Sequence, residues 1–372
     1  MTMEDSNQLG EFDLIARFFN RQSLMGNHKP HDISSANSVL LGIGDDCALI
    51  TSPPAGYCLA ITTDMLVENR HFFSSADPEK LGHKCLAVNL SDLAAIGAKP
   101  VAYTLSLALP YVNAPWLASF AKGLHQLADY HDCQLIGGDT TQGPLTISIT
   151  AFGHVPNSQS LRRSQAQLGD DIWLSNVVGD ARYLLGVERG EWQPSQVLDS
   201  IQARLHCPTP RIELGIALLG IAHAAIDLSD GLLGDLKHIL IASKWNADIW
   251  IDQIPTSQIV SALSPELRRL CTLKGGDDYE LCFTAPEKNR QIISQISQEL
   301  NAENKEIEAL KKEKKSLVKR YGKDAEAVMY GRATNIAKKQ AESMNKEKIK
   351  ELSRKDGFFL IMENNKTIPI AR

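Results

Sequence analysis

Apolar and polar positions alternate with two different spacings along the chain, up to about Glu287. Short runs rich in β-branched and aromatic residues predict strands. The clearest of these runs are 58–67, 101–109 and 145–155. Stretches with apolar residues at helical spacing separate the runs, so the sequence predicts an α/β fold, or α+β with mixed sheets.

Two helices are predicted between these strands. The first begins at Asp77, a favourable N-cap residue, has Pro78 at its first position and ends near Gly97. The second carries four large apolar residues at helical spacing: Leu117, Phe120, Leu124 and Leu127. Residues spaced in this way share one face of a helix, so we expect that face to be buried.

The length of 372 residues favours two domains, because a single core rarely grows to that size. The polar stretch 156–169 predicts the linker between them. A second strand–helix series follows, marked by Trp173-Leu174, by a helix through Leu214, Leu218 and Leu219, and by a strand at 281–284. We therefore expect an N-terminal α/β domain over 1–155 and a C-terminal α/β domain over 156–300.

The composition changes after residue 300. Residues 301–356 are rich in Lys, Glu and Ala and contain no proline. This predicts one or two solvated helices that are dispensable for the folding of the rest; a partner-binding helix or coiled-coil arm is the less favoured alternative. Residues 357–372 predict a short β tail, a hairpin of 358–362 with 367–370.

Six short acidic motifs lie beside apolar strands or helices. They are Gly44-Asp45-Asp46, Thr62-Thr63-Asp64, Asn89-Leu90-Ser91-Asp92, Gly137-Gly138-Asp139, Asp227-Leu228-Ser229-Asp230 and Gly275-Gly276-Asp277-Asp278-Tyr279-Glu280. A buried carboxylate is costly unless it is compensated, and too few arginines lie nearby in the sequence to pair them all. Hard oxygen ligands suit Mg²⁺, which bridges readily to phosphates. The glycines before Asp46, Asp139 and Asp277 predict tight turns where backbone amides approach a phosphate.

Each motif alone is also typical of an ordinary turn, and Asp227 could cap a helix that starts at Leu228. As a set, the motifs favour chemistry with metal and phosphate. The signatures of a P-loop enzyme, a protein kinase and a Gly-x-Ser-x-Gly hydrolase are missing from the sequence.

Charge and cysteine content exclude other classes of protein. The net charge of −5 is not typical of a nucleic-acid binder, and no apolar run is long enough to span a membrane. The N-terminus lacks the pattern of a signal peptide. Seven scattered cysteines without a Cys-x-x-Cys pair predict neither a disulfide framework nor a zinc site. We expect a cytoplasmic protein.

The order of these motifs resembles that of the bacterial thiamine-monophosphate kinase family. Further matching motifs are Gly10-Glu11-Phe12, Asn69-x-His71-Phe72 and Arg163-Ser164. The resemblance runs from about Gly10 to about Leu300. It implies a two-domain architecture like that of aminoimidazole ribonucleotide synthetase, with homodimerisation through the N-terminal domain.

The resemblance also implies roles for individual residues. The implied Mg²⁺ ligands are Asp46, Thr62, Thr63, Asp64, Asp92, Asp139, Asp227 and Asp230. The implied ATP contacts are Gly138, Asp139, Arg163 and Ser229. His71 and Asp277 would contact the second substrate, and Asp277 stands where the family usually has the longer Glu. The family's C-terminal substrate aromatic has no match, and Phe358 and Phe359 are candidates only by default.

The implied reaction is ATP- and Mg²⁺-dependent phosphorylation of thiamine monophosphate to thiamine diphosphate. The attacking phosphate oxygen is largely ionised near neutral pH, because the second pKa of a phosphate monoester is ~6. In-line transfer then needs no separate catalytic base and no phosphoenzyme. Two alternatives remain: a relative in the same superfamily with another substrate, and a non-catalytic scaffold.

Overall fold

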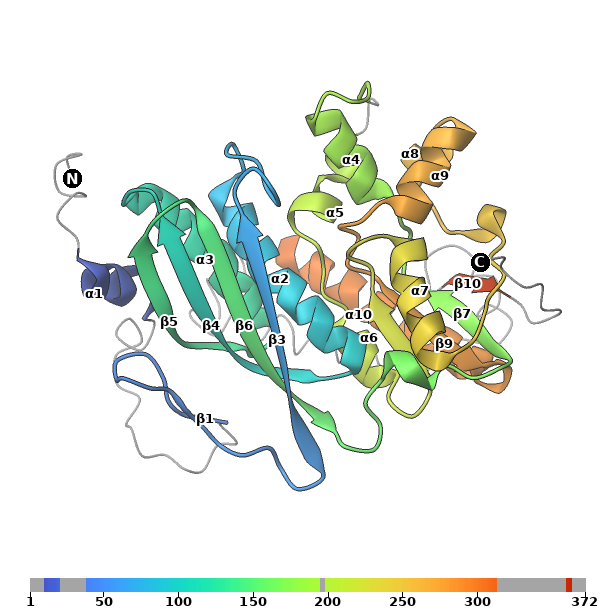
Figure 1. Cartoon of the computed structure of the whole chain (residues 1–372), viewed down its shortest axis with the longest axis horizontal. Helices are drawn as coiled ribbons and strands as arrows, with labels where there is room; N and C mark the ends of the chain where they lie inside the picture. The colour runs from blue at the N-terminus through green and yellow to red at the C-terminus, as the bar shows by residue number, and fades with distance from the viewer. Residues whose placement is uncertain (1–9, 21–37, 195–197, 313–358, 363–372) are drawn as a thin grey trace.

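The computed structural model describes residues 10–20, 38–194, 198–312 and 359–362. Figure 1 shows two sheets lying side by side, with helices packed behind the first and around the second. One contiguous apolar core joins them, since it includes Leu90 beside the first sheet and Phe283 within the second. The mixed α/β architecture predicted from the sequence is confirmed for these residues.

The first sheet has four strands in the order β3-β6-β4-β5. The strands are β3 (Tyr57–Val67), β4 (Lys99–Leu109), β5 (Gln134–Gln142) and β6 (Thr146–Pro156). β4 and β5 are parallel, whereas β6 is antiparallel to both β3 and β4. The runs predicted as strands at 58–67, 101–109 and 145–155 are confirmed. A small separate pair precedes them, β1 (Val39–Leu41) with β2 (Leu49–Ile50).

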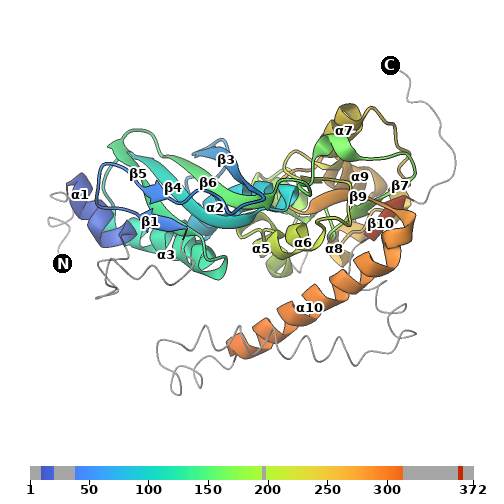
Figure 2. The same cartoon turned by 90° about the horizontal axis from the view of Figure 1, so that it is seen from below.

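Helices α2 (Pro78–Ile96) and α3 (Ala114–Tyr130) cover one face of this sheet (Figures 1 and 2). Asp77 caps α2 by accepting a 3.0 Å hydrogen bond from the amide of Lys80, and Gly97 ends the helix at φ 75°. The predicted start and end of α2 are confirmed. The four apolar residues predicted to share a face of α3 are all buried.

The second sheet is antiparallel, in the order β10-β7-β9-β8. Its strands are β7 (Asp170–Leu174), β8 (Ala224–Asp227), β9 (Leu281–Pro286) and β10 (Phe359–Met362). The helices around it are α4 (Asp180–Glu188), α5 (Gln202–His206), α6 (Ile212–Ala217), α7 (Leu232–Ser243), α8 (Gln258–Ser261) and α9 (Pro265–Lys274). At the other end of the molecule, α1 (Glu11–Leu14) continues into a π-helical turn, Ile15–Phe19.

Two local expectations and one alternative reading differ from the structure. The helix predicted through Leu219 ends at Ala217, and 218–220 form a turn. Asp227 does not cap a helix, because it is the last residue of β8 and α7 begins at Leu232. The stretch 156–169 is more than a spacer: its Leu161 is buried in the core, and Arg163–Gln165 form a 3₁₀ turn, η4.

Helix α10 (Arg290–Lys312) runs across the expected boundary at residue 300 without a break. Arg290 anchors its start through two hydrogen bonds to the buried carboxylate of Asp171, at 2.6 and 2.8 Å. Figure 2 shows the helix running from the second sheet back beneath α6. Residues 313–358, most of the predicted charged segment, lie outside the described residues.

Residues 359–362 of the predicted hairpin form the strand β10, and the described partner of β10 is β7. The other half of the predicted hairpin, 367–370, lies outside the described residues, as does Phe358. No helix in the described part of the chain is long and apolar enough to cross a membrane.

Candidate functional site

The candidate site begins where β3 faces α2. Alternation along β3 turns Thr62 and Asp64 toward the helix. The hydroxyl of Thr62 donates a hydrogen bond to the carboxylate of Asp92. The amide of Asp64 donates to Asn89 Oδ1 at 3.1 Å, and Asn89 Nδ2 donates in turn to Cys85 O. Asn89 and Asp92 are three residues apart on α2, so they share the face of the helix that contacts β3.

Asp227 joins this group from the end of β8, in the second sheet. Ser91, on α2, donates from its hydroxyl to Asp227 Oδ2 at 2.8 Å. Asp227 is buried, and it is electrostatically coupled to both Asp64 and Asp92. Three predicted metal ligands from three separate elements therefore come together between the two sheets.

These carboxylates are destabilised as anions. Burial, followed by repulsion from Asp92, raises the pKa of Asp64 to about 6 and that of Asp227 to about 7. Burial also raises the pKa of Asp92, against the hydrogen bond from Thr62 and the positive charge of Arg163. A group of buried carboxylates that repel one another gains stability from a cation placed between them.

The donor set fits Mg²⁺. Carboxylate and hydroxyl oxygens are its preferred protein ligands, and Mg²⁺ commonly keeps water and substrate phosphate in its shell. Within the part of the chain that the structure describes, no three His, Cys, Asp or Glu side chains already surround one point as a finished metal site.

A loop at the start of α7 carries Ser229 and Asp230, whose side chains are exposed. Asp235 shapes this loop, because one of its oxygens accepts from the amides of Asp230 and Gly231, both at 3.0 Å. Asp235 is not among the site residues predicted from the sequence. Its signal was an acidic residue in the first turn of a helix that directly follows the Asp-Leu-Ser-Asp-Gly motif.

The segment 275–280 packs directly on this loop. The amide of Asp277 donates to Ser229 O at 2.9 Å, and that of Tyr279 donates to Leu228 O at 2.8 Å. Asp277 and Tyr279 both have left-handed backbones, with φ 65° and 49°. Gly276 permits the contact, because a Cβ there would lie 2.2 Å from Ser229 O. The carboxylate of Asp277 pairs with Lys84 at 2.9 Å, a partner that the sequence reasoning missed.

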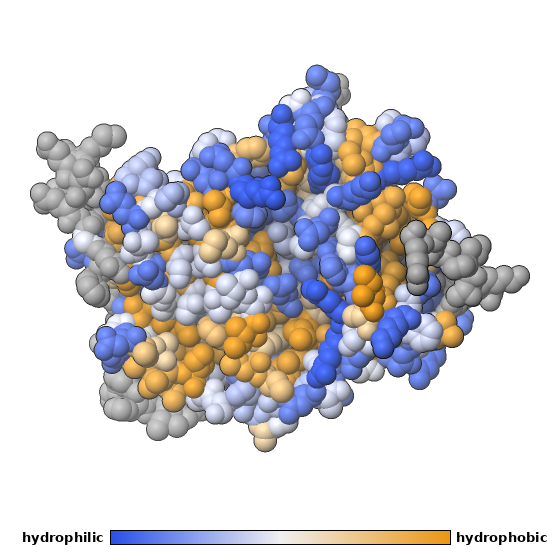
Figure 3. All heavy atoms as spheres, in the orientation of Figure 1, coloured by the Kyte–Doolittle hydropathy of each residue, from blue (hydrophilic) through white to orange (hydrophobic). Residues whose placement is uncertain are grey.

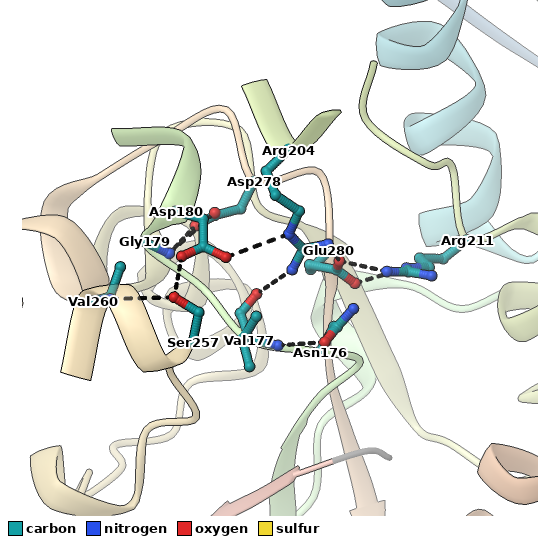
Figure 4. A network of polar contacts seen from close by, with 10 residues as sticks. All are labelled: Asn176, Val177, Gly179, Asp180, Arg204, Arg211, Ser257, Val260, Asp278 and Glu280. Carbon is teal, nitrogen blue, oxygen red and sulfur yellow. Dashed lines mark hydrogen bonds and ion pairs between the residues drawn. The ribbon is translucent and has the colours of Figure 1, made fainter. Parts of the chain in front are cut away.

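The last two acidic residues of this motif have structural partners (Figure 4). Arg204 and Arg211 both bind the buried Glu280, and against the effect of burial they hold its pKa below the usual value. Both oxygens of Asp278 accept from the amide of Gly179 at 3.1 Å. The expectation that too few arginines could pair these carboxylates is wrong for Glu280, because its partners come from distant parts of the chain.

Two predicted ligands lie elsewhere on the first sheet. The hydroxyl of Thr63 points away from α2 and lies 2.9 Å from that of Thr150. Asp139 is exposed on β5, at the edge of the sheet opposite β3. The turn expected at Gly138 is wrong: this residue lies within β5 at φ 145°, where a Cβ would meet Leu105 O at 1.8 Å.

Three more predicted site residues have defined places. Asp46 lies in the exposed turn between β1 and β2, and its amide donates to Asp45 Oδ1. Arg163 begins η4, close enough to Asp92 to lower its pKa. His71 follows β3, and its Nδ1 accepts from the amide of Val67 at 2.9 Å. That bond assigns the imidazole proton of the neutral ring to Nε2, which is left to donate elsewhere.

The chain is similar in sequence and in fold to proteins of known structure. Residues 44–155 match the family model "AIR synthase related protein, N-terminal domain". The AaThiL structure complexed with AMPPCP and TMP is 26% identical, with a TM-score of 0.59 over 78% of this chain and 88% of that one. The crystal structure of thiamine-monophosphate kinase from Stenotrophomonas maltophilia K279a is 45% identical, with a TM-score of 0.67 over 72% of this chain and 86% of that one.

Sequence comparison with a known relative also shows similarity to a thiamine-monophosphate kinase. The thiamine-monophosphate kinase of Salmonella typhimurium is 47% identical over 288 residues, which cover 76% of this chain and 85% of the relative. Identity of this extent, together with a matching fold and an acidic group between the two sheets, shows that the chain belongs to the thiamine-monophosphate kinase family.

Proposed function

We propose that this chain transfers the terminal phosphoryl group of ATP to the phosphate of thiamine monophosphate, giving thiamine diphosphate and ADP. Membership of the kinase family supports the reaction. The observation that carries the proposal is the meeting of Asp64, Asp92 and Asp227 between the two sheets. Buried carboxylates with raised pKa values suit a site that is completed by metal-bound phosphates.

In the proposed reaction an oxygen of the acceptor phosphate attacks the γ-phosphorus of ATP. The bond from that phosphorus to the β,γ-bridging oxygen breaks, and the oxygen leaves with the electron pair as part of ADP. No side chain has to remove a proton, because the acceptor is already largely ionised above its second pKa of ~6. Bound Mg²⁺ supplies charge neutralisation and alignment of the two anions.

The residues around the acidic group have separate tasks in this proposal. Thr62, Asp64, Asp92 and Asp227 hold Mg²⁺, with Asp230 at the rim. Arg163, whose charge already acts on Asp92, also stabilises the ATP phosphates. Ser229, exposed on the loop before α7, contacts ATP.

On the acceptor side, we assign His71 to the phosphate of thiamine monophosphate. Its Nε2–H is the donor left by the bond from Val67 to Nδ1. A neutral imidazole held in this way presents one N–H in a fixed direction.

Asp46, Thr63 and Asp139 complete the proposed ligands, with Gly138 and Asp139 also as ATP contacts. Thr63 and Asp139 lie on the two edge strands of the first sheet, three strand spacings of about 4.8 Å apart. That separation is too large for one ion within a protomer. The proposal therefore requires several Mg²⁺ ions.

We also propose a homodimer formed through the first sheet. None of the described helices covers its face opposite α2 and α3, and Figure 3 shows apolar side chains gathered over that face. Leu59, Ile61 and Met65 alternate along β3 on this face and are exposed. A second copy of the chain would remove this apolar surface from water, which a monomer would leave exposed.

The experiment that tests the proposed function measures thiamine diphosphate formed from thiamine monophosphate, ATP and MgCl₂. The parent should turn over, and chelation of Mg²⁺ should abolish turnover. Asp230→Asn should keep its melting temperature and lose at least about 100-fold in rate, because it removes a charge from the metal rim. The matched control is Asp252→Asn, whose side chain is 93% exposed.

An inactive parent with intact mass and a cooperative melting transition would contradict the proposed function. Activity of Asp230→Asn within a fewfold of the parent at saturating Mg²⁺ would contradict the metal assignment alone. The control should match the parent in both rate and stability.

A further inference from the structure

Lys84 places a charged amine in a buried position near the candidate site. It lies on α2, and its side chain is only 8% exposed. A buried ammonium group is costly unless a counter-charge accompanies it. The counter-charge is Asp277, whose Oδ1 lies 2.9 Å from Lys84 Nζ. This ion pair joins a helix of the first half of the chain to a loop of the second.

Asp277 is held in an unfavourable backbone conformation. A left-handed φ is unfavourable in a residue other than glycine, and both Asp277 and Tyr279 adopt one. The hydroxyl of Tyr279 donates a 3.3 Å hydrogen bond to Asp277 Oδ1, the same oxygen that pairs with Lys84. Two donors on one oxygen fix the direction of this carboxylate and help to hold the loop in its strained form.

The strained loop in turn supports Ser229. The amide of Asp277 donates to Ser229 O, and Gly276 lies too close to that oxygen for any side chain. Ser229 and its neighbour Asp230 are therefore backed by the loop that Lys84 holds. A shift of this loop would carry Ser229 with it.

Lys84 and Ser91 stand seven residues apart on α2, so they share one face of the helix. Ser91 binds Asp227, and Lys84 binds Asp277. The same helix face thus contacts both the strand end that precedes Ser229 and the loop packed against it. Helix α2 therefore supports segment 227–230 at two points, directly through Asp227 and indirectly through the loop that contains Asp277.

We propose that Lys84 is a positioning residue for phosphoryl transfer. It neutralises Asp277 and holds the loop 275–280 against Ser229, so that the ATP side of the site keeps its geometry. Without the ammonium, the carboxylate of Asp277 would repel incoming phosphates and the loop would lose the contact that offsets its strain. The proposal rests on the proposed function for its rate measurement, but its binding measurement does not.

The test compares Lys84→Met, Asp277→Asn and the double variant, with Lys122→Met as the matched control. Lys122 also pairs with a carboxylate across α2 and α3, at 2.7 Å from Glu79, but its side chain is 57% exposed. Lys84→Met should lower kcat by roughly 10- to 100-fold, the range expected for a misplacement of about 1 Å. The double variant should be no slower than the slower single variant, because the two groups act as one unit.

Two further measurements distinguish a positioning role of Lys84 in the reaction from a role in stability alone. The double variant removes both charges and should regain the melting temperature lost in Lys84→Met, while its kcat stays low. Lys84→Met should also raise the Kd of Mg·ATP by about 10-fold in calorimetric titrations without thiamine monophosphate. Lys84→Arg, which keeps the charge, should recover part of both losses.

Unchanged kcat and Kd in Lys84→Met would overturn the proposal, as would rate losses that multiply in the double variant. Equal losses in Lys122→Met would overturn it as well. An inactive parent would refute the proposed kinase reaction, and the titration with Mg·ATP would still decide the role of Lys84.

Discussion

The hydroxyl of Ser91 and the carboxylate of Asp227 form a 2.8 Å hydrogen bond across 136 residues of sequence. The bond joins α2 to the end of β8, and it ties Asp227 to the helix that also carries Asp92. Asp227 is destabilised as an anion by burial and by Asp92, and Ser91 opposes both effects. The strength of metal binding should therefore depend on a side chain that is not itself a ligand.

Ser91→Ala should raise the Mg²⁺ concentration required for half-maximal activity by about 10-fold. A hydrogen bond to a charged group contributes about 1.5–3 kcal/mol, and its loss raises the pKa of Asp227 further. A Mg²⁺ titration of the rate at fixed ATP measures this effect. Ser294→Ala is the control, because the hydroxyl of Ser294 donates to Arg290 O within its own helix. Identical Mg²⁺ curves for the two variants would refute the link.

His71→Asn should raise the KM for thiamine monophosphate by about 10-fold and leave the KM for ATP unchanged. An Asn side-chain oxygen can still accept from the amide of Val67, so the turn after β3 should survive. The Nε2–H donor is lost. The melting temperature checks the turn, and two substrate titrations check the roles. A parallel rise in both KM values would rule out a role on the acceptor side.

His131→Phe should make the protein less sensitive to acid. Burial, with a contribution from His83, lowers the pKa of His131 to about 4, whereas an unfolded histidine titrates near 6.5. Between these values the unfolded chain binds a proton that the folded chain does not. The free energy of unfolding therefore falls as the pH drops from 6.5 through 4, by about 3 kcal/mol in all.

Urea unfolding at pH 7.5 and at several values down to pH 4.5 measures that slope. The 3.6 Å approach of Glu213 to His131 does not offset burial, so we treat this pair as a neutral histidine beside a carboxylate. The exposed His238→Phe is the control and should keep the parent's slope. An unchanged slope in His131→Phe would show that other groups dominate the acid response.

Ile61→Asp should convert the proposed homodimer to a monomer. Ile61 is 60% exposed on the face of the first sheet opposite α2 and α3, and a charge there would have to be buried on association. Light scattering after size-exclusion chromatography gives the mass directly. Ile241→Asp, at 64% exposure on α7, should leave the mass unchanged. A parent of monomeric mass at micromolar concentration would refute the dimer.

Much of the first sheet was predictable from the sequence, because its signals are local. The N-cap of α2, the strand runs and the apolar face of α3 depend on residues within a few positions of one another. Part of the site was predictable for a related reason. An aspartate in an otherwise apolar strand or helix, such as Asp64 or Asp92, signals a compensated charge wherever the chain places it.

The partners of other charges were not predictable from the sequence. Glu280 meets Arg204 and Arg211 across 76 and 69 residues, and no local pattern ties them together. Gly138 belongs to a Gly-Gly-Asp sequence that is also typical of a turn. In the structure, its lack of a side chain allows the parallel strands β4 and β5 to lie close together. The role of Lys84 was unpredictable for the same reason. In the sequence it is an ordinary lysine within a helix, and only the fold places Asp277 beside it.

The pairing of β10 with β7 has a consequence for the chain during its synthesis. Ribosomes release β7, β9 and β8 well before residues 359–362 emerge. Throughout that interval β7 presents an unpaired edge, a template on which another nascent chain could add a strand. Slow translation between residues 313 and 358 would lengthen the exposure, so synonymous codon choice in that stretch should influence how much of the protein aggregates.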